Sequence, residues 1–130
     1  MDIGIDLGTS NVLVYVKGRG VVINQPSVVA YEKSSKRIIA IGNKAKKMIG
    51  KTPESIEVVR PLVKGVVSDY IVTERMLKAF IRSAMEKRTG VGRPKICVCV
   101  PSGVTEVERR AVEEAVYRTG AKSVYVMEEP

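Results

Sequence analysis

The sequence of 130 residues is long enough for one small domain or for part of a larger protein. It is 45% hydrophobic but only 5% aromatic, so its core must be aliphatic, and its lack of His excludes Ser–His and Cys–His catalytic pairs. Lys and Arg outnumber Asp and Glu by 22 to 14, a balance that suits either an anionic partner or simply a solvated basic surface.

A hairpin is predicted at the start of the chain. Residues 3–7 alternate apolar side chains with small or polar ones, which is the period of a strand. Residues 8–11 read Gly-Thr-Ser-Asn and predict a tight turn, because Gly8 tolerates a positive φ and Ser and Asn bond the local backbone. Residues 12–16 then form a second strand, which leaves the carboxylate of Asp6 at the neck of the hairpin.

The tip of this hairpin suits a polyphosphate. Gly8 lets the backbone approach a ligand closely, and successive N–H groups together with the hydroxyls of Thr9 and Ser10 can donate to phosphate oxygens. Asp6 would repel phosphate, but it can hold a hydrated Mg²⁺, which favours carboxylate oxygen and keeps several waters. Taken alone, the stretch fits an ordinary polar turn equally well.

Short strands and one short helix are predicted up to residue 60. The strands have short connections, which favour antiparallel pairing, and they cover residues 21–24, 28–31, 38–41 and 56–59. Pro26 breaks the chain between the first two, because it lacks a backbone donor. A helix over 44–49 is expected, with Asn43 as its N-cap and Gly50 at its end.

Helices and strands alternate in the second half of the chain. Apolar residues at helical spacing predict a helix over 70–87. The continuous apolar run 95–100 predicts a buried parallel strand, in which we interpret Cys97 and Cys99 as small buried apolar residues. These two thiols cannot form a structural zinc site by themselves, and the sequence has no His to complete one.

The last predicted helix begins at a capping box. The side chain of Thr105 can accept from the backbone of Glu108, whose carboxylate can reach back. This helix runs to about residue 119, with its apolar face formed by Val107, Val112, Ala111 and Ala115. A final strand over 121–127 can lie parallel to 95–100 through a right-handed crossover.

These elements predict an α/β fold. Antiparallel hairpins followed by a parallel unit make a mixed five-stranded sheet with flanking helices. The segment 26–65 is predicted to be a small inserted α/β unit with its own strands and helix.

Several stretches resemble the MreB family of bacterial actin homologues, and they occur in the same order along the chain as in that family. The opening residues 3–11 resemble the first phosphate loop of the actin-like ATPases. The other matching stretches are Asn24-Gln25-Pro26-Ser27-Val28-Val29-Ala30, Met48-Ile49-Gly50-Lys51-Thr52-Pro53, Arg60-Pro61-Leu62, Gly65-Val66-Val67-Ser68-Asp69-Tyr70, Pro101-Ser102-Gly103-Val104-Thr105, Val107-Glu108-Arg109-Arg110-Ala111 and Glu128-Glu129-Pro130.

The resemblance implies subdomain I of the actin-like ATPase fold, which is ribonuclease H-like. Residues 1–25 and 66–130 would form subdomain IA, and 26–65 would form subdomain IB. The resemblance also implies an ATP and Mg²⁺ site, in which Asp6 matches the acidic residue near the cation and Glu129 matches the residue that orients the attacking water. The phosphate contacts match the turn, at Gly8, Thr9, Ser10 and Asn11.

The function implied by the resemblance is that of an ATP-binding cytoskeletal protein. Members of the family form filaments, determine rod cell shape and organise wall synthesis at the membrane. The implied partners are other protomers, the inner membrane surface and wall-synthesis or elongation proteins, and no nucleic acid. The sequence shows no secretory signal and no apolar run near the ~20 residues of a membrane span. We therefore expect a cytoplasmic protein, peripheral at the inner face of the membrane, with 89–93 as one candidate membrane loop.

Two other classes of protein remain as alternatives. One is the ATPase lobe of an Hsp70-like chaperone or a sugar kinase, since the first phosphate loop barely separates these from the MreB family. The other is a basic nucleic-acid-binding module, which the single Phe, the absent Trp and the lack of any helix-turn-helix or zinc signature disfavour.

The sequence departs from the family in two respects. Ser10 stands where the family usually has Ala, which adds a hydroxyl to the turn. The second phosphate loop, the adenosine pocket and the second half of the fold have no counterpart in these residues. We therefore expect an N-terminal fragment of an ATPase that is itself inactive and binds ATP weakly or not at all.

Overall fold

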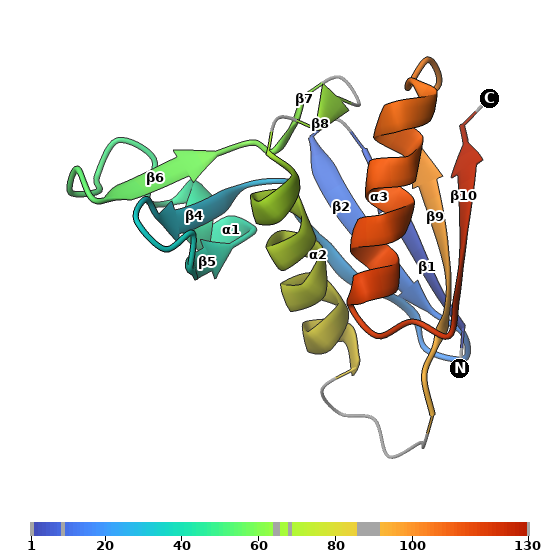
Figure 1. Ribbon diagram of the computed structural model, residues 1–130. Helices are drawn as coiled ribbons and strands as arrows, with labels where there is room; N and C mark the ends of the chain where they lie inside the picture. The colour runs from blue at the N-terminus through green and yellow to red at the C-terminus, as the bar shows by residue number, and fades with distance from the viewer. Residues whose placement is uncertain (1, 9, 64–65, 68, 86–91, 130) are drawn as a thin grey trace.

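The computed structural model describes residues 2–8, 10–63, 66–67, 69–85 and 92–129 (Figure 1). Its main layer is a five-stranded sheet in the order β10-β9-β1-β2-β3. The strands are β1 (Asp2–Leu7), β2 (Asn11–Val16), β3 (Gly20–Pro26), β9 (Lys95–Val100) and β10 (Ser123–Glu128). The first three pair antiparallel, whereas β9 lies parallel to both β1 and β10. The predicted mixed five-stranded sheet is therefore confirmed.

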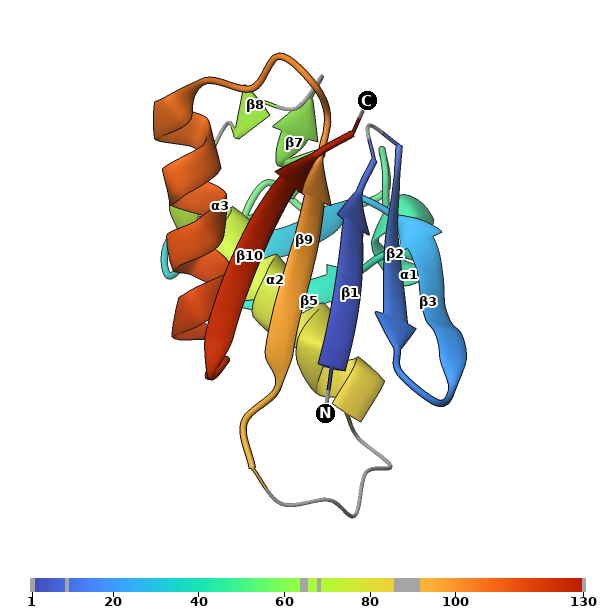
Figure 2. The ribbon, with the colours of Figure 1, turned by 90° about the vertical axis from the view of Figure 1, so that its right-hand side faces the viewer.

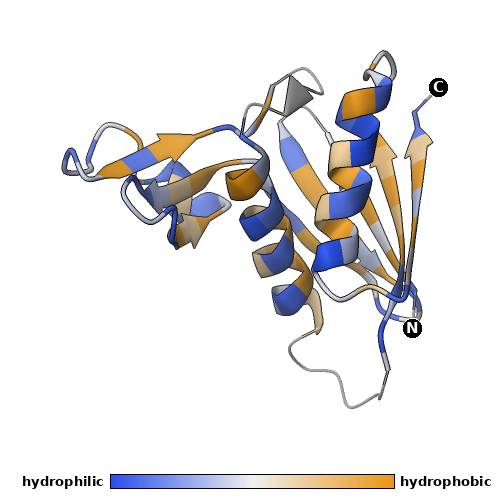
Figure 3. Cartoon of the chain, viewed as in Figure 1, coloured by the Kyte–Doolittle hydropathy of each residue, from blue (hydrophilic) through white to orange (hydrophobic). Residues whose placement is uncertain are grey.

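Two helices, α2 (Tyr70–Met85) and α3 (Glu106–Arg118), cover one face of this sheet (Figures 1 and 2). The alternate residues of β1, β2 and β9 that point toward the helices are buried, as the period of a strand requires. Apolar bands on the strands face helices of mixed polarity in Figure 3. No helix in the described part of the chain is both long and apolar enough to cross a bilayer.

The opposite face of the sheet is not covered by any helix of the described chain, and Figure 2 shows it facing the viewer. Tyr15, Val21, Tyr125 and Met127 are 49%, 62%, 73% and 51% exposed on the strands there. Cys97 and Cys99 are half-buried free thiols. The prediction that both cysteines are buried was wrong, because alternation along β9 turns Ile96, Val98 and Val100 toward the helices and the cysteines away from them.

A smaller sheet lies beside α2 in Figure 1. Its order is β5-β4-β6, with β4 antiparallel to both neighbours. The elements of this unit are β4 (Val29–Glu32), β5 (Ile38–Ile41), α1 (Asn43–Lys46) and β6 (Ile56–Val59). A hairpin of β7 (Leu62–Val63) and β8 (Val66–Val67) leads back toward α2. The boundaries of subdomains IA and IB stay a prediction.

Several predicted details differ from the structure. Pro26 does not break β3 but is its last residue, which is possible because β3 is an edge strand and needs no donor on its outer side. Helix α1 is shorter than predicted, since Met48, Ile49 and Lys51 donate to carbonyls three residues back and end the α-helical pattern.

The start of α1 also differs. Gly42, with φ 64°, is its N-cap residue, and Asn43 is already helical. The backbone N–H of Asn43 donates to Oε1 of Gln25 at 3.2 Å, so a side chain from β3 takes the role expected of an Asn43 cap.

In α3, Val107 is 69% exposed rather than buried, because the helix turns Val112, Ala115 and Val116 toward the core.

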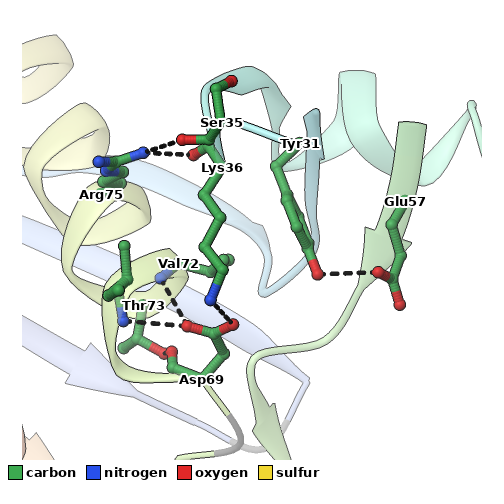
Figure 4. A network of polar contacts seen from close by, with 9 residues as sticks. Tyr31, Ser35, Lys36, Glu57, Asp69, Val72, Thr73 and Arg75 are labelled. Atoms are coloured by element: carbon green, nitrogen blue, oxygen red, sulfur yellow. Dashed lines mark hydrogen bonds and ion pairs between the residues drawn. The ribbon is translucent and has the colours of Figure 1, made fainter. Parts of the chain in front are cut away.

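A polar network fastens the β4–β5 turn to the start of α2 (Figure 4). Nζ of Lys36 lies 2.9 Å from Oδ2 of Asp69. The other oxygen of Asp69 accepts the backbone N–H groups of Ile71 and Val72, so this carboxylate also caps α2. Arg75 donates to the carbonyls of residues 35 and 36 at 2.9 and 2.8 Å. The small sheet is therefore held against α2 by charged hydrogen bonds as well as by packing.

Charged partners shift the pKa values of two groups near this junction. Burial opposes ionisation of Asp69, but the hydrogen bond and charge of Lys36 and the N–H groups of α2 outweigh it and lower its pKa. Burial, a hydrogen bond to Glu57 and nearby negative charge raise the pKa of Tyr31 to about 12. The Tyr31 hydroxyl donates to Oε2 of Glu57 at 2.9 Å and thereby links β4 to β6.

Candidate functional site

The candidate site lies at one edge of the main sheet, where three parallel strands end. In the register of the sheet, Asp6 of β1 and Met127 of β10 both pair with Cys99 of β9. Glu129 follows Met127 by two residues, and its backbone N–H donates to the carbonyl of Val100 at 2.9 Å. The carboxyl ends of β1, β9 and β10 therefore meet at the edge that carries the turn after β1 (Figure 2).

The two predicted carboxylates, Asp6 and Glu129, are brought together by this arrangement. The pKa of Glu129 is raised, first by its side-chain hydrogen bond with Asp6, then by the negative charge of Asp6 and by burial. Oδ1 of Asp6 is buried, and no atom of the described chain hydrogen-bonds to it. A buried carboxylate oxygen without a donor is costly, so this oxygen is free to accept a ligand.

Cys99 lies between the strands that carry these carboxylates. Burial, Cys97 and the charges of Asp6 and Glu129 raise the pKa of its thiol, which disfavours the thiolate. Its position on the same face as Asp6 follows from the register of β1 and β9. This proximity could not be foreseen from the sequence, because it depends on which strands are neighbours.

Gly8 follows β1 and lies tightly against the end of the turn. A Cβ atom built on Gly8 would lie 3.0 Å from the carbonyl oxygen of Asn11. The φ of Gly8 is not positive, so the positive φ predicted for this glycine was wrong. Glycine is favoured at this position because a side chain would crowd the carbonyl of Asn11.

The remaining residues of the turn present polar groups at the surface. Ser10 and Asn11 are exposed, and Thr9 lies outside the described residues. The amide Nδ2 of Asn11 donates to Oδ1 of Asn24 on β3 at 2.9 Å, which orients this side chain. The carbonyl of Ser10 accepts the backbone N–H of Ser27 at 2.8 Å. The turn is thus anchored to the segment that leads into the small sheet.

The residues present fit a hydrated Mg²⁺ and a polyphosphate. Mg²⁺ prefers oxygen ligands, keeps several waters and needs only one or two carboxylates, and Asp6 offers a buried oxygen that is free to accept. Within the described ranges, no cluster of three or more potential protein ligands occurs. The donor set therefore suits a cation held largely through water and phosphate rather than by a full protein cage.

The hollows on the surface lie mostly away from this edge. One groove of about 460 Å³ runs between α2 and α3, and its lining includes Tyr70, Val107 and Arg110. A shallower depression of about 250 Å³ on the uncovered face of the sheet reaches Asp6 and is lined mainly by apolar side chains, including those of Tyr15 and Cys99. Of these two hollows, the depression on the uncovered face borders the candidate site and the groove between the helices does not.

The sequence profile of one protein family, described as MreB/Mbl protein, matches residues 1–130. The chain belongs to the MreB/Mbl family. The cell shape-determining protein Mbl of Bacillus subtilis (strain 168) is 49% identical over 129 residues, and the cell shape-determining protein MreB of Escherichia coli (strain K12) is 47% identical over 133 residues. Each match covers 99% of this chain but only 38% of the relative, so the chain spans less than two fifths of their length.

Solved structures of MreB5 and of MamK share the fold. MreB5 of Spiroplasma citri bound to ADP superposes with a TM-score of 0.81 at 42% identity, over 97% of this chain and 37% of that one. The same protein bound to AMPPNP gives 0.79 at 37% identity, with 97% and 38% covered. The MamK double helical filament gives 0.74 at 24% identity over 98% of this chain and 40% of that one, a likeness of fold alone.

Membership of the MreB/Mbl family decides between the interpretations that the sequence left open. The expected actin-like fold is confirmed by both the family match and the superposition on MreB5. The family match favours a cell-shape protein over a chaperone ATPase, a sugar kinase or a nucleic-acid-binding module. Arg60 and Ser27, which contact Ser10, were not among the predicted site residues.

Proposed function

We propose that residues 1–130 carry one wall of the nucleotide site of an ATP-binding, filament-forming protein that determines cell shape. The observation that supports this best is the meeting of Asp6, Glu129 and the turn at residues 8–11 at one edge of the sheet. MreB5, a family member of the same fold, has been crystallised with ADP and with AMPPNP. Relatives at 47–49% identity are named for cell-shape determination.

Each side chain would have a separate part in this site. Backbone N–H groups of the turn, the hydroxyls of Thr9 and Ser10 and the amide of Asn11 would donate to phosphate oxygens, and Gly8 would allow the close approach. Asp6 would hold the hydrated Mg²⁺, which supplies charge neutralisation to the phosphates when bound.

Glu129 would orient the water that attacks the terminal phosphate. Phosphoryl transfer depends on placing the nucleophile in line and on stabilising charge, so a carboxylate one water away is enough. The pKa of Glu129 is raised by its neighbour Asp6. Shifted pKa values of this kind are common among residues of functional sites, which supports the proposed role.

Nucleotide binding and hydrolysis in the protein at its full natural length would test this function. We expect the wild type to bind Mg-ATP and release phosphate, Glu129→Gln to bind but lose most phosphate release, and Asp6→Asn to need more Mg²⁺ for binding. Glu113→Gln, an exposed change on α3, serves as the control. A wild type that binds no Mg-ATP, or a Glu129→Gln variant that hydrolyses at the wild-type rate, would contradict the proposal.

We propose the same biological setting as for the family, with other protomers, the inner membrane surface and wall-synthesis proteins as partners. The candidate membrane loop at 89–93 falls partly outside the described residues. Basic residues near an anionic bilayer contribute about 1 kcal/mol each. Co-sedimentation with anionic vesicles should therefore fall in an Arg88→Glu/Arg93→Glu variant. Unchanged sedimentation would exclude this loop as the membrane contact.

A further inference from the structure

Strand pairing in the small sheet brings Arg60 to the phosphate turn. β6 ends at Val59, which pairs with Val29 of β4. Two residues before Val29, the backbone N–H of Ser27 donates to the carbonyl of Ser10. The residue that follows β6 therefore lies next to the turn, although Arg60 and Ser10 are 50 positions apart in the sequence.

The contact between Arg60 and the turn is weak and leaves most of the guanidinium free. Nη1 of Arg60 lies 3.5 Å from the carbonyl oxygen of Ser10, at the long limit for such a bond, and the side chain is exposed. The same carbonyl already accepts the shorter bond of 2.8 Å from Ser27. Because a guanidinium has five donors, Arg60 can move to a better acceptor with little loss.

The charges around the turn favour a phosphate as that acceptor. Asp6 and Glu129 engage each other, and Arg60 forms no ion pair with any described residue. A nucleoside triphosphate placed beside two carboxylates needs positive charge near its outer phosphates. Among the described side chains, only the cation of Arg60 donates to a residue of the turn.

We propose that Arg60 is a phosphate-binding residue of this site and that its guanidinium contacts the outer phosphates of a bound nucleoside triphosphate. The inference rests on the proposed function, because it adds a ligand to the same site. Arginine suits this part, since its planar fork matches two phosphate oxygens at once. The contact would also tie the end of β6, and with it the small sheet, to the occupied site.

Nucleotide affinities of charge-matched variants test the proposal. The protein at its full natural length is compared with Arg60→Gln, Arg60→Lys and the control Arg37→Gln, which removes the same charge from the exposed β4–β5 turn. Dissociation constants for Mg-ATP and for adenosine are measured by calorimetry. We expect Arg60→Gln to weaken Mg-ATP at least about tenfold, as for the loss of a hydrogen bond to a charged group, and to leave adenosine unchanged.

Arg60→Lys should lie between the wild type and Arg60→Gln for Mg-ATP, because it keeps the charge but not the fork. If Arg60→Gln does not fold, Arg60→Lys is measured in its place, and the ratio of its Mg-ATP affinity to its adenosine affinity is compared with that of the wild type. Equal Mg-ATP affinities of Arg60→Gln and Arg37→Gln would overturn the role of Arg60 while leaving the proposed function intact. Equal losses for Mg-ATP and adenosine would make Arg60 structural and overturn it too. A wild type that binds no Mg-ATP would overturn both.

Discussion

At the scale of single residues, Gly8 shows that one of two reasons predicted for a residue can fail while its position in a turn is as expected. The sequence suggested a glycine that needs a positive φ, as in many turns. The structure instead disfavours a Cβ here, because a side chain would crowd the carbonyl of Asn11. The second reason predicted for Gly8, close approach of a ligand, stays a prediction.

Gly8→Ala should therefore disturb the turn more than its small size suggests. The new methyl would lie 3.0 Å from the Asn11 oxygen, and overpacking of this kind costs about 1–3 kcal/mol. Urea unfolding should show this loss. Gly4→Ala, in the preceding strand β1, is the matched control, since its Cβ would meet only Cβ of Tyr15 at 3.8 Å. Equal stabilities of the two variants would contradict the steric explanation.

Residues of the candidate site could be predicted from the sequence only where they lie close together in the chain. Asp6 and the turn were found from local pattern, because they are neighbours in the chain. Glu129 was found only through family resemblance, since nothing in a terminal Glu-Glu-Pro indicates that it meets β1. Arg60 was missed, because its contact with Ser10 depends on the pairing of β4 with β6.

At the scale of elements, the best-predicted features are those whose causes are local. The capping box of α3 is present as expected, with the Thr105 hydroxyl accepting from the Glu108 N–H at 3.1 Å and the Glu108 carboxylate accepting from the Thr105 N–H at 3.2 Å. The cap of α1 and the inward face at Val107 were mispredicted. Both are decided by neighbours from elsewhere in the chain, Gln25 in one case and the sheet in the other.

The capping box gives a direct prediction for α3. Thr105→Ala should destabilise the protein by about 1 kcal/mol, because the first turn of the helix loses its side-chain acceptor. Thr105→Ser keeps the hydroxyl and should remain close to the wild type. Thermal and urea unfolding of the three proteins would measure the effect. A Ser variant as unstable as the Ala variant would point to the lost methyl group rather than the cap.

The junction of α2 with the small sheet predicts a dependence on pH. The pKa of Asp69 is lowered by folding, so its charge contributes stability that is present above the unfolded pKa of about 3.9 and is lost as the pH falls through the folded value. Asp69→Asn keeps a good N-cap but removes the ion pair with Lys36. Since both side chains are partly exposed, the loss at pH 7 should be about 1 kcal/mol or less.

Urea unfolding of the wild type and Asp69→Asn between pH 7 and pH 2 would measure this contribution. The difference between them should be constant down to about pH 4 and then shrink. Glu113→Gln, on the exposed side of α3, controls for general effects of charge. A difference that stays constant to the lowest pH would show that the carboxylate of Asp69 is not the cause.

At the scale of the whole molecule, the directions of the strands and the pairing of β10 with β9 were predictable, whereas the pairing of β9 with β1 and the covering of the sheet were not. The apolar run of β9 correctly indicated a parallel strand, and the crossover rule fixed the place of β10. A strand buried on both faces was expected for β9. Within the described chain, however, helices cover one face only, and the cysteines remain half-buried.

Residues 1–130 by themselves should bind Mg-ATP poorly. The candidate site offers groups from one edge of one sheet, and the matched region is 38% of the length of its relatives. A nucleotide held on one side loses much of the burial that ligand sites usually provide. Isothermal titration of Mg-ATP into this polypeptide should give no saturable binding at micromolar concentration. Micromolar affinity would show that one wall is enough.

The uncovered face of the sheet has a practical consequence for work with this polypeptide. Tyr15 and Val21 expose large apolar groups on the neighbouring strands β2 and β3, and Tyr125 and Met127 do so on β10 at the opposite edge of the sheet. Exposed apolar groups of this kind favour association between molecules. Concentrated preparations of residues 1–130 would therefore be prone to aggregate and to adsorb to surfaces, and dilute samples would remain monomeric longest.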